Sequence, residues 1–393
     1  MEEIVILGGA RTPIGSFGKA LASVPPAELG AIAGRAAMDR AGIEPGQVHA
    51  VVVGSVGQIG ADAYVGRAVG LGAGLPVEAP ALTVNRLCGS GLQAIISAAG
   101  AIRIGDARMV LAVGTENMSR YPHLAYGARW GIRLGDAVLQ DGVLAALTDP
   151  FTDGHMGLTA ETVAEGQRVG RADQDAFAAE SHRRAADAVT SGRFAGEIVP
   201  VEVPGRGGPT VVDTDEHPRP ATTVEALAAL RPAFREGGTV TAGNASGLAD
   251  GAAAVVVAAA SHARDLGLRP RARLVGYGIV GVPPEIMGMG PVPAVRKALA
   301  RTGLALADID LIELNEAFAA PSVACIRELG LDPDRVNVNG GAIALGHPIG
   351  ATGCILVVKL LAELERRGGR YGLATACIGG GQGIAAIFER LDA

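Results

Sequence analysis

The sequence predicts a layered α/β fold built from two similar halves, with a long irregular segment inserted in the first half. Short apolar, β-branched stretches alternate along the chain with stretches in which apolar residues recur at helical spacing. Residues 84–91 and residues 338–350 are similar in outline, because each leads from a strand end through a glycine-containing turn into an apolar helix. Between residues 121 and 245, prolines, arginines and aspartates replace the regular pattern. Together these observations favour two α/β halves placed side by side.

The first half alternates strands with helices. The apolar stretch that opens the chain is interrupted at Thr12-Pro13. The helical pattern at 27–41 ends at Gly42, a residue that readily adopts the left-handed conformation that closes a helix. We therefore predict strands at 3–8, 49–53, 81–84 and 108–113, and helices at 27–41, 64–71 and 92–102.

The inserted segment contains one clear helical pattern, at 174–191, and a loop rich in proline, glycine and charge at 203–220. The apolar run 252–260 then resumes the core, either as a helix or as a central strand. The last two strands of the second half are joined across glycines and should form a hairpin. For the second half we predict strands at 273–277, 310–314, 336–339, 373–378 and 383–388, and helices at 294–301, 321–329 and 353–366.

Length and composition limit what the protein can be. The 393 residues are enough for a large core, and the formal net charge of −6 argues against a nucleic-acid binder or a binder of anionic membranes. The longest apolar run, 252–260, is too short to span a bilayer. The four cysteines form no CxxC pair and the first residues lack a basic leader, so we expect reduced thiols and a cytoplasmic protein. The seven histidines form no HExxH pattern, and we expect no metal site.

Cys88 lies in a glycine-flanked turn directly before the predicted helix 92–102. The N–H groups and the dipole of a helix N-terminus favour a thiolate, and the thiolate is the nucleophilic form of cysteine. We expect Gly89 and Gly91 to remove side chains that would block a carbonyl group from approaching the backbone. The alternative is that Cys88 is a small buried apolar residue, as a lone cysteine between apolar segments often is.

Three other positions could complete a site around this cysteine. His347 stands at the start of the second-half helix that corresponds to the helix after Cys88, where it could accept the thiol proton. Cys377 precedes the turn Gly379-Gly380-Gly381, whose N–H groups could converge on an oxyanion. Asn315 follows a predicted strand and could anchor a water or a carbonyl group. Taken singly, a surface turn histidine and an ordinary glycine hairpin stay open as alternatives.

Five ordered motifs make the chain resemble the thiolase family over essentially its whole length. They are NRLCGSG at 85–91, RPAF at 231–234 followed by GTVTAGNASG at 238–247, NEAFA at 315–319, GGAIALGHPIGATG at 340–353 and CIGGG at 377–381. The motifs look most like those of biosynthetic acetyl-CoA acetyltransferases. The resemblance implies a five-layered αβαβα fold of two pseudo-duplicated halves with an inserted loop domain for CoA binding and oligomerisation. It also implies a homotetramer, a dimer of dimers.

The division that follows places the first half in residues 1–120 and 246–270, the inserted loop domain in 121–245 and the second half in 271–393. The implied reaction joins two acetyl-CoA molecules into acetoacetyl-CoA and free CoA, or cleaves a 3-ketoacyl-CoA in reverse, with no cofactor besides the CoA thioesters. Cys88 would carry the acyl group and His347 would take its proton. Cys377 would remove a proton from the second acetyl-CoA. His347 with a water held by Asn315, and the N–H groups of Cys88 and Gly379, would form two oxyanion holes.

The resemblance also implies contacts with the CoA substrate. Arg219 would lie near the nucleotide and Ser246 near the pantetheine amides. The remaining residues would line the tunnel or close around the acyl group: His155, Met156, Phe234, Ala242, Leu248, Met287, Ala317 and Phe318. Two departures from the family pattern occur: Ala226 stands where some relatives have serine, and residues 120–130 differ from the expected tetramerisation loop.

Other functions within this fold stay open. A 3-ketoacyl-CoA thiolase of broader chain length, acting in fatty-acid degradation, would share the catalytic residues and differ in pocket width. Met156 and Met287 favour a short pocket, although methionine adapts its shape easily. A non-condensing, lipid-binding relative would often carry histidine in the motif that here reads Asn315-Glu316-Ala317-Phe318. A ketoacyl synthase would pair its cysteine with two histidines, whereas this chain offers Asn315, His347 and a second cysteine.

Overall fold

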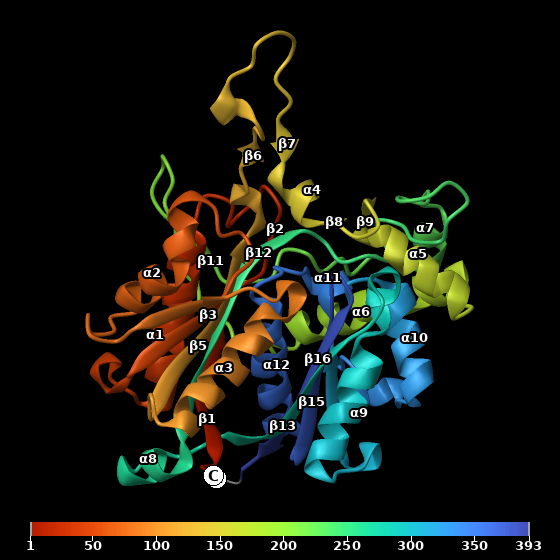
Figure 1. Ribbon diagram of the computed structural model, residues 1–393. Coiled ribbons are helices and arrows are strands. Elements are labelled where there is room, and N and C mark those ends of the chain that lie inside the picture. The colour runs from red at the N-terminus through yellow and green to blue at the C-terminus, as the bar shows by residue number, and fades with distance from the viewer. Residues whose placement is uncertain (1, 392–393) are drawn as a thin grey trace.

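A computed structural model describes residues 2–391 and shows a mixed sheet running through the molecule (Figure 1). The strand order is β14-β15-β16-β13-β1-β12-β5-β3-β4, and the short β2 pairs with β12. The strands are β1 Ile4–Arg11, β2 Gly15–Ser16, β3 Ala50–Gly54, β4 Ala81–Val84, β5 Met109–Asn117, β12 Ala249–Ala259, β13 Ala272–Gly281, β14 Leu311–Leu314, β15 Tyr371–Ile378 and β16 Gln382–Arg390. The two halves meet where β1 pairs with β13 at only two positions.

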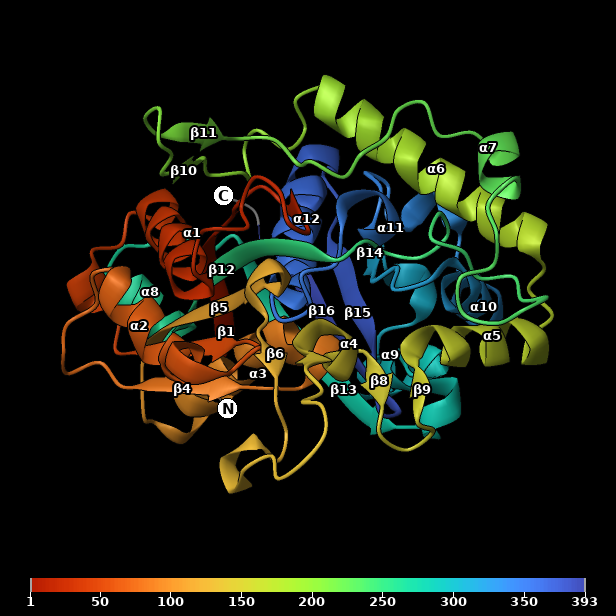
Figure 2. The same cartoon turned by 90° about the horizontal axis from the view of Figure 1, so that it is seen from above.

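Helices cover both outer faces of this sheet and fill its middle. Helices α1 and α2 pack on the first half, and α9 and α10 pack on the second half. Helices α3 and α12 lie between the halves and bury side chains against strands of both (Figures 1 and 2). The predicted five-layered αβαβα fold is therefore confirmed. The helices are α1 Pro26–Ala41, α2 Val65–Gly72, α3 Ser90–Ile104, α8 Ala260–Asp265, α9 Pro291–Thr302, α10 Ala319–Leu329, α11 Ala342–Leu345 and α12 Thr352–Arg367.

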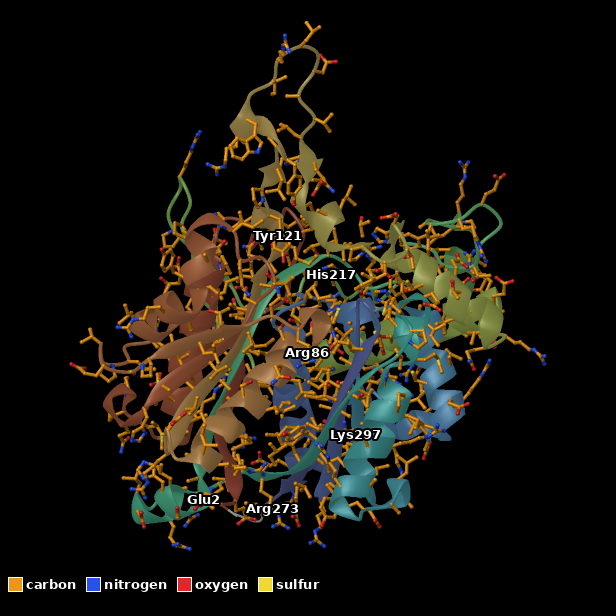
Figure 3. All side chains as sticks on the ribbon, in the orientation of Figure 1. Glu2, Arg86, Tyr121, His217, Arg273 and Lys297 are labelled. Atoms are coloured by element: carbon orange, nitrogen blue, oxygen red, sulfur yellow. The ribbon has the colours of Figure 1, made fainter. Side chains whose placement is uncertain are left out.

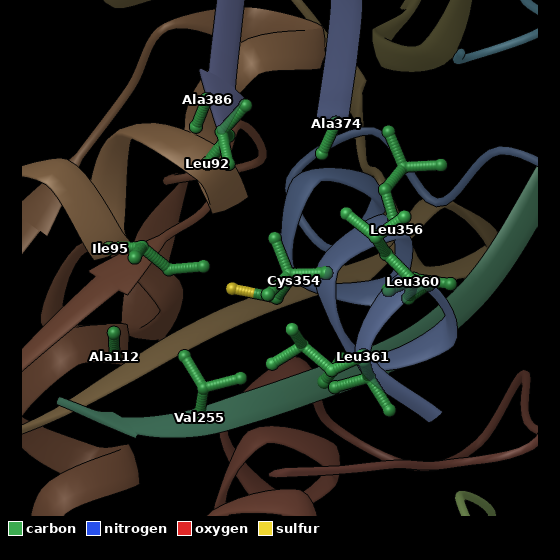
Figure 4. Packing of buried hydrophobic residues seen from close by; sticks show 14 of the residues in the cluster. Leu92, Ile95, Ala112, Val255, Cys354, Leu356, Leu360, Leu361, Ala374 and Ala386 are labelled. Atoms are coloured by element: carbon green, nitrogen blue, oxygen red, sulfur yellow. The ribbon is translucent and has the colours of Figure 1, made fainter. Parts of the chain in front are cut away.

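The core between the halves is built from closely packed apolar side chains. Figure 4 shows Leu92 and Ile95 of α3 on the side of Cys354 in α12, with Val255 of β12 below them and Leu356 on the opposite side of α12. By length and hydropathy alone, the described residues contain one segment that could cross a membrane, Leu87–Ile104, but 56% of it is buried inside the protein. That burial is what a core helix requires.

The two halves repeat one arrangement of strands. In the first half β3 is parallel to β4 and β5, and β5, β12 and β1 then follow in antiparallel pairs. In the second half β14 is parallel to β15, and β15, β16 and β13 follow in antiparallel pairs. In the second half, the counterpart of β4 would be the strand predicted at 336–339. This prediction is wrong, because only a single bridge, between Val336 and Ile312, forms there.

The side chain of Asn337 explains why this strand does not form. Asn337 has a φ of 45°, and its amide accepts from the N–H of Leu314 and donates to the C=O of Leu314, both at 2.8 Å. These bonds occupy the edge of β14 that a backbone strand would use. The apolar run 252–260, left open from the sequence, is the central strand β12, buried on both faces between β1 and β5.

The predicted insertion contains short elements that extend from the core. Strands β6 and β7 form an arm that projects from the molecule, and α5, α6 and α7 lie over the second half (Figures 1 and 2). The division of the chain at 120/121 and 245/246 stays a prediction. The elements are β6 His123–Leu124, β7 Gln140–Asp141, α4 Gly142–Ala146, β8 Thr148–Asp149, β9 Gly154–His155, α5 Met156–Gly166, α6 Arg171–Thr190, β10 Val201–Val203, β11 Thr210–Val212 and α7 Val224–Ala228.

Candidate active site

Cys88 stands in a 3-10 turn, Leu87–Gly89, between β4 and α3. Side chains close the turn: Asn85 Oδ1 accepts from the N–H of Leu87 at 3.0 Å, and Ser90 Oγ donates to Leu87 O at 2.7 Å. Leu87 has a φ of 44°, in the left-handed region that residues with side chains rarely adopt. Such backbone strain is held by surrounding structure and clusters at functional sites.

The two glycines that flank Cys88 do not have the role expected from the sequence. A Cβ atom on Gly91 would lie 2.6 Å from the backbone N of Cys354 in α12, and a Cβ atom on Gly353 would lie 2.0 Å from the N of Leu92. A Cβ atom on Gly89 would meet Ile378 at 2.7 Å. These glycines therefore allow α3, α12 and β15 to approach one another closely, rather than clearing a path for a substrate carbonyl group.

Arg86 ties the Cys88 turn to the other half of the protein. Its guanidinium donates to Gln93 Oε1 in α3 at 2.8 Å and to Gln382 Oε1, at the start of β16, at 2.7 Å. Figure 3 shows Arg86 in the middle of the molecule, where the two halves meet. The turn that holds Cys88 is thereby fixed relative to the hairpin that holds Cys377.

Burial, rather than the helix N-terminus, decides the charge of Cys88. Burial raises the pKa of the Cys88 thiol to about 11, although the backbone N–H groups of Gly379 and of Cys88 itself lower it, and the nearby Glu116 raises it further. Near neutral pH this raised pKa favours a resting thiol over the thiolate expected from the helix N-terminus. The two N–H groups that reach the thiol sulfur are the same two that the family resemblance assigned to an oxyanion hole.

We expect the alkylation of Cys88 by iodoacetamide to accelerate throughout the range from pH 6.5 to pH 9.5. Because the thiol pKa is raised to about 11, the thiolate fraction should grow roughly tenfold per pH unit over this range. Mass spectrometry of the peptide that contains Cys88 gives the rate, and a Cys88→Ala protein gives the background from other thiols. A rate that stops rising near pH 7 would mean that a thiolate is already present in the resting protein.

His347 is buried, with 7% of its surface exposed, on the loop that leads into α12. Its Nδ1 atom lies 2.6 Å from Thr352 Oγ1, and its Nε2 atom lies 3.4 Å from Asn315 Nδ2. Burial lowers the pKa of His347 to about 4, so the ring is neutral near pH 7 and able to accept a proton. Its backbone N–H donates to Gly247 O at 3.0 Å, which fixes the loop beside the segment 244–248.

A buried carboxylate holds this loop against the first half of the protein. Glu116, in β5, accepts hydrogen bonds from the N–H groups of Val56, Gly57 and Gly350 at 3.0, 3.0 and 2.9 Å. Burial raises its pKa, and these N–H donors lower it. Through its hydrogen bond with the Gly350 N–H, Glu116 fixes the loop that carries His347 relative to β5 of the first half.

Asn315 and Glu316 follow β14 and have different neighbours. Among residues 2–391, Asn315 Oδ1 is buried without a hydrogen-bond partner, while its Nδ2 faces His347. The Glu316 carboxylate accepts from Ser181 Oγ at 2.6 Å and from Asn337 Nδ2 at 2.7 Å. Glu316 thus links α6 of the inserted segment to the second half, and Asn315 remains available beside the histidine.

Cys377 lies one residue before the end of β15 and packs in a buried cluster with Met156, Met287 and Phe318. Burial is the main cause that raises its pKa well above the ordinary value, and the neighbouring Cys88 adds to the effect. A glycine turn follows, in which Gly380 and Gly381 have φ values of 76° and 84°. These conformations let the hairpin reverse tightly and direct the Gly379 N–H toward Cys88.

These residues meet at a cavity of about 340 Å³, which lies within the range of small-molecule sites. Twelve of the fifteen residues selected from the sequence line this cavity: Cys88, His155, Met156, Phe234, Ala242, Ser246, Leu248, Met287, Ala317, Phe318, His347 and Gly379. Aromatic contacts build its wall, because the rings of His155 and Phe234 are stacked with their centroids 4.7 Å apart. Cys377 and Asn315 do not line the cavity. Cys377 packs behind it in the cluster with Met156, Met287 and Phe318, and Asn315 contacts His347, which does line it.

Arg219 is the selected residue that the structure places elsewhere. It does not line the cavity, and its backbone N–H donates to Nδ1 of His182 in α6 at 3.3 Å. The irregular stretch around Arg219 carries no periodic pattern that would have located its side chain from the sequence.

Eight residues of the cavity wall were not selected from the sequence, nor were two polar residues behind the wall, Thr352 and Glu116. Leu144 comes from the short α4 and Leu147 directly follows it, and the few apolar residues of this helix give too weak a helical pattern to detect. Thr352 and Glu116 act through buried hydrogen bonds that only the packed structure creates. The missed wall residues are Leu87, Leu144, Ala146, Leu147, Ala233, Ala245, Gly247 and Ile349.

Known proteins share this arrangement over the full chain. A protein of Cupriavidus necator named Beta-ketothiolase BktB is 56% identical over 392 residues, which are 99% of this chain and 100% of that protein. An acetyl-CoA acetyltransferase of Pseudomonas aeruginosa is 53% identical with the same coverage. The crystal structure of human mitochondrial 3-ketoacyl-CoA thiolase in complex with CoA superimposes with a TM-score of 0.96 at 44% identity, covering 99% of this chain and 98% of that one.

Two family models match consecutive parts of the chain. The model described as the thiolase N-terminal domain matches residues 4–261, and that of the thiolase C-terminal domain matches residues 268–390. The boundary falls between β12 and β13, where the first half of the sheet gives way to the second. The fold, the full-length similarity and both family models agree: the chain belongs to the thiolase family.

Proposed function

We propose that this protein is an acetyl-CoA C-acetyltransferase that condenses two acetyl-CoA molecules into acetoacetyl-CoA and free CoA, and also catalyses the reverse thiolysis. One observation carries the proposal: the Cys88 thiol lines an apolar cavity together with a neutral histidine and two N–H donors, and a second thiol, Cys377, packs directly against residues of the cavity wall. The names that the relatives carry, beta-ketothiolase and acetyl-CoA acetyltransferase, support the same chemistry. The condensation takes only CoA thioesters as substrates, the reverse thiolysis also takes free CoA, and neither direction needs a cofactor.

The first step transfers the acetyl group to Cys88. His347 Nε2 takes the thiol proton while the sulfur attacks the thioester carbonyl carbon, and CoA leaves as a thiolate that is then protonated. The resting thiol and the neutral imidazole fit a proton transfer that accompanies the attack rather than precedes it. The N–H groups of Cys88 and Gly379 would then stabilise the oxyanion, and one such donor contributes roughly 10²–10³-fold to the rate.

The second step forms the carbon–carbon bond. The CoA thiolate released in the first step takes the proton of the Cys377 thiol and leaves as free CoA. The Cys377 thiolate then removes a proton from the methyl group of a second acetyl-CoA, and the resulting carbanion attacks the carbonyl carbon of the acyl-Cys88, whose sulfur regains its proton from His347. The bond between this carbon and the Cys88 sulfur breaks, and acetoacetyl-CoA is released. The enolate oxygen needs strong stabilisation, because a proton beside a thioester is only weakly acidic. His347 and a water bound to Asn315 are suited to supply it, because Asn315 offers a buried Oδ1 beside the histidine.

The rest of the CoA molecule would enter along the apolar wall. Phe234, Ala242 and Leu248 fit the pantetheine chain, and Ser246 offers polar groups for its amides. The inserted segment 121–245 supplies part of this wall. Arg219 stays a proposed contact for the nucleotide, outside the cavity itself.

We expect the protein to cleave four-carbon 3-ketoacyl-CoA at least roughly tenfold faster than the sixteen-carbon homologue, as kcat/KM in the presence of CoA. Met156, Met287 and Phe318 line the cavity and pack against Cys377, and we expect these large side chains to limit the room for the acyl group. Loss of the 3-ketoacyl-CoA absorbance gives both rates. The Met287→Ala variant should reduce the preference, because it lengthens the pocket.

A matched control is Met289→Ala, since Met289 is buried in the outer core of the second half and does not line the cavity. That variant should keep the chain-length preference of the unmodified protein. Comparable rates for the two substrates in the unmodified protein would instead favour the broader 3-ketoacyl-CoA thiolase of fatty-acid degradation. A non-condensing lipid-binding role would show no cleavage of either substrate.

The proposal includes a homotetramer in the cytoplasm. Strand β4 lies at the end of the sheet, and its Leu82 is 52% exposed, as an edge strand that pairs with a second copy would require. The β6–β7 arm carries Trp130 and Leu134, which are 87% and 97% exposed. Exposed apolar side chains gathered on a projecting arm mark an interaction surface. These two surfaces suit a dimer of dimers.

A further inference from the structure

Thr352 is the first residue of α12 and is buried, with 3% of its surface exposed. Its hydroxyl group lies between two atoms: His347 Nδ1 at 2.6 Å and the carbonyl oxygen of Pro348 at 3.0 Å. A threonine hydroxyl has one proton to donate and can accept on its lone pairs. The direction of these two hydrogen bonds therefore decides which nitrogen of His347 carries the ring proton.

One direction avoids a contact between two acceptors at this hydroxyl group. The Pro348 carbonyl, which also accepts from the N–H groups of Ala351 and Thr352 at 2.9 and 3.0 Å, can only accept, and the Thr352 hydroxyl lies in donating geometry to it. The Oγ1 atom is then left to accept, and His347 Nδ1 must donate to it. In the opposite direction, the hydroxyl proton would point to Nδ1, and two oxygen acceptors would face each other at 3.0 Å without a proton between them.

The other side of the ring agrees with this direction. His347 Nε2 lies 3.4 Å from Asn315 Nδ2, a donor. A bare Nε2 can accept from this amide, whereas a protonated Nε2 would meet a second donor. His347 lines the same cavity as Cys88, and Thr352 occupies its Nδ1 atom, which leaves Nε2 as the nitrogen available there.

We propose that Thr352 is a positioning residue that holds His347 as the Nδ1–H tautomer, leaving Nε2 bare toward the cavity as the acceptor of the Cys88 proton. The inference rests on the proposed function for the identity of that proton. When Nε2 accepts it, the ring becomes a cation, and the chain from Nδ1–H through Thr352 to the Pro348 carbonyl is already oriented to stabilise the charge. This support matters because burial disfavours a charged His347.

The test combines a spectroscopic readout with kinetics on the full-length protein and its variants. Solid-state NMR of histidine labelled with 15N distinguishes a protonated ring nitrogen from a bare one, and a His347→Gln protein identifies the signal among the seven histidines. The unmodified protein and Thr352→Ser should both show a protonated Nδ1 and a bare Nε2. Thr352→Val should lose this preference and acylate Cys88 roughly 10- to 100-fold more slowly, the range for a hydrogen bond to a charged group.

A matched control is Thr302→Val, because Thr302 makes the same hydroxyl contact with the carbonyl four residues earlier in α9, at 3.2 Å. It should leave the His347 spectrum and the rate unchanged. An Nε2–H signal in the unmodified protein, or a Thr352→Val protein with unchanged spectrum and rate, would overturn the proposal. If Thr352→Val does not fold, the spectra of the unmodified protein and of Thr352→Ser still decide the tautomer. Acylation of a Cys88→Ala protein would refute the proposed function while leaving the tautomer result intact.

Discussion

The Cys88→Ala variant is expected to take up no acetyl group from radiolabelled acetyl-CoA, and its condensation and thiolysis rates should fall at least about 10⁴-fold. Among the residues that the structure describes, Cys88 is the cysteine that lines the cavity, whereas Cys325, Cys354 and Cys377 are buried. The N–H groups of Gly379 and Cys88 point to the sulfur at position 88, so an acyl group elsewhere would lack their stabilisation.

The measurement is the radioactivity that stays with the protein after denaturation and gel filtration, followed by identification of the labelled peptide. Cys325→Ala is a suitable control, because Cys325 is buried in α10, where its thiol donates to Gly288 O at 3.3 Å, and it does not line the cavity. This control should be labelled at Cys88 like the unmodified protein. Stoichiometric labelling of the Cys88→Ala protein would show that another group carries the acyl chain.

The Cys377→Ala variant should keep acylation but lose condensation by roughly 10²–10⁴-fold, the usual contribution of a general base. Removing this thiol leaves the Cys88 turn intact, because the bonds that close the turn come from Asn85 and Ser90. The first acetyl transfer should therefore proceed and release one equivalent of CoA. The acyl-enzyme should then accumulate, since no base remains to activate the second acetyl-CoA.

Two measurements separate these steps. Rapid mixing with acetyl-CoA should give a burst of free CoA with little acetoacetyl-CoA, and the methyl protons of acetyl-CoA should no longer exchange with deuterated solvent. The Cys354→Ala variant removes a buried thiol from the core between α3 and α12 and should keep that exchange. Normal condensation by Cys377→Ala would require a different base, and the assignment of the second step would then be wrong.

Much of the fold could be predicted because local patterns and global packing agree. The apolar stretches at β1, β5 and β15 are buried along their length, and helices such as α1 end at glycines in the left-handed conformation. The prediction of a strand at 336–339 was wrong. Its apolar, β-branched residues are typical of a strand, but the side-chain amide of Asn337 forms the hydrogen bonds with Leu314 that a paired strand would make. A side chain that replaces backbone hydrogen bonds leaves no periodic signal.

The residues of the site could be selected from motifs, but their physical state could not. The turn before α3 suggested a thiolate at Cys88, because the sequence shows the helix N-terminus and not the surrounding apolar wall. Burial outweighs the dipole and raises the thiol pKa to about 11. Likewise Gly91 and Gly353 stand in different motifs, and only their contact across α3 and α12 explains why each position requires glycine.

The sequence by itself determined the fold class, the family and the turn in which Cys88 stands, because apolar periodicity and ordered motifs are properties of the chain alone. What surrounds that turn depends on the packed structure: an apolar cavity, a neutral His347 in contact with Thr352, and a loop tied to the first half by Glu116. Protonation states, tautomers and cavity walls depend on burial and on contacts between residues far apart in the chain. Those quantities exist only once the two halves have packed together.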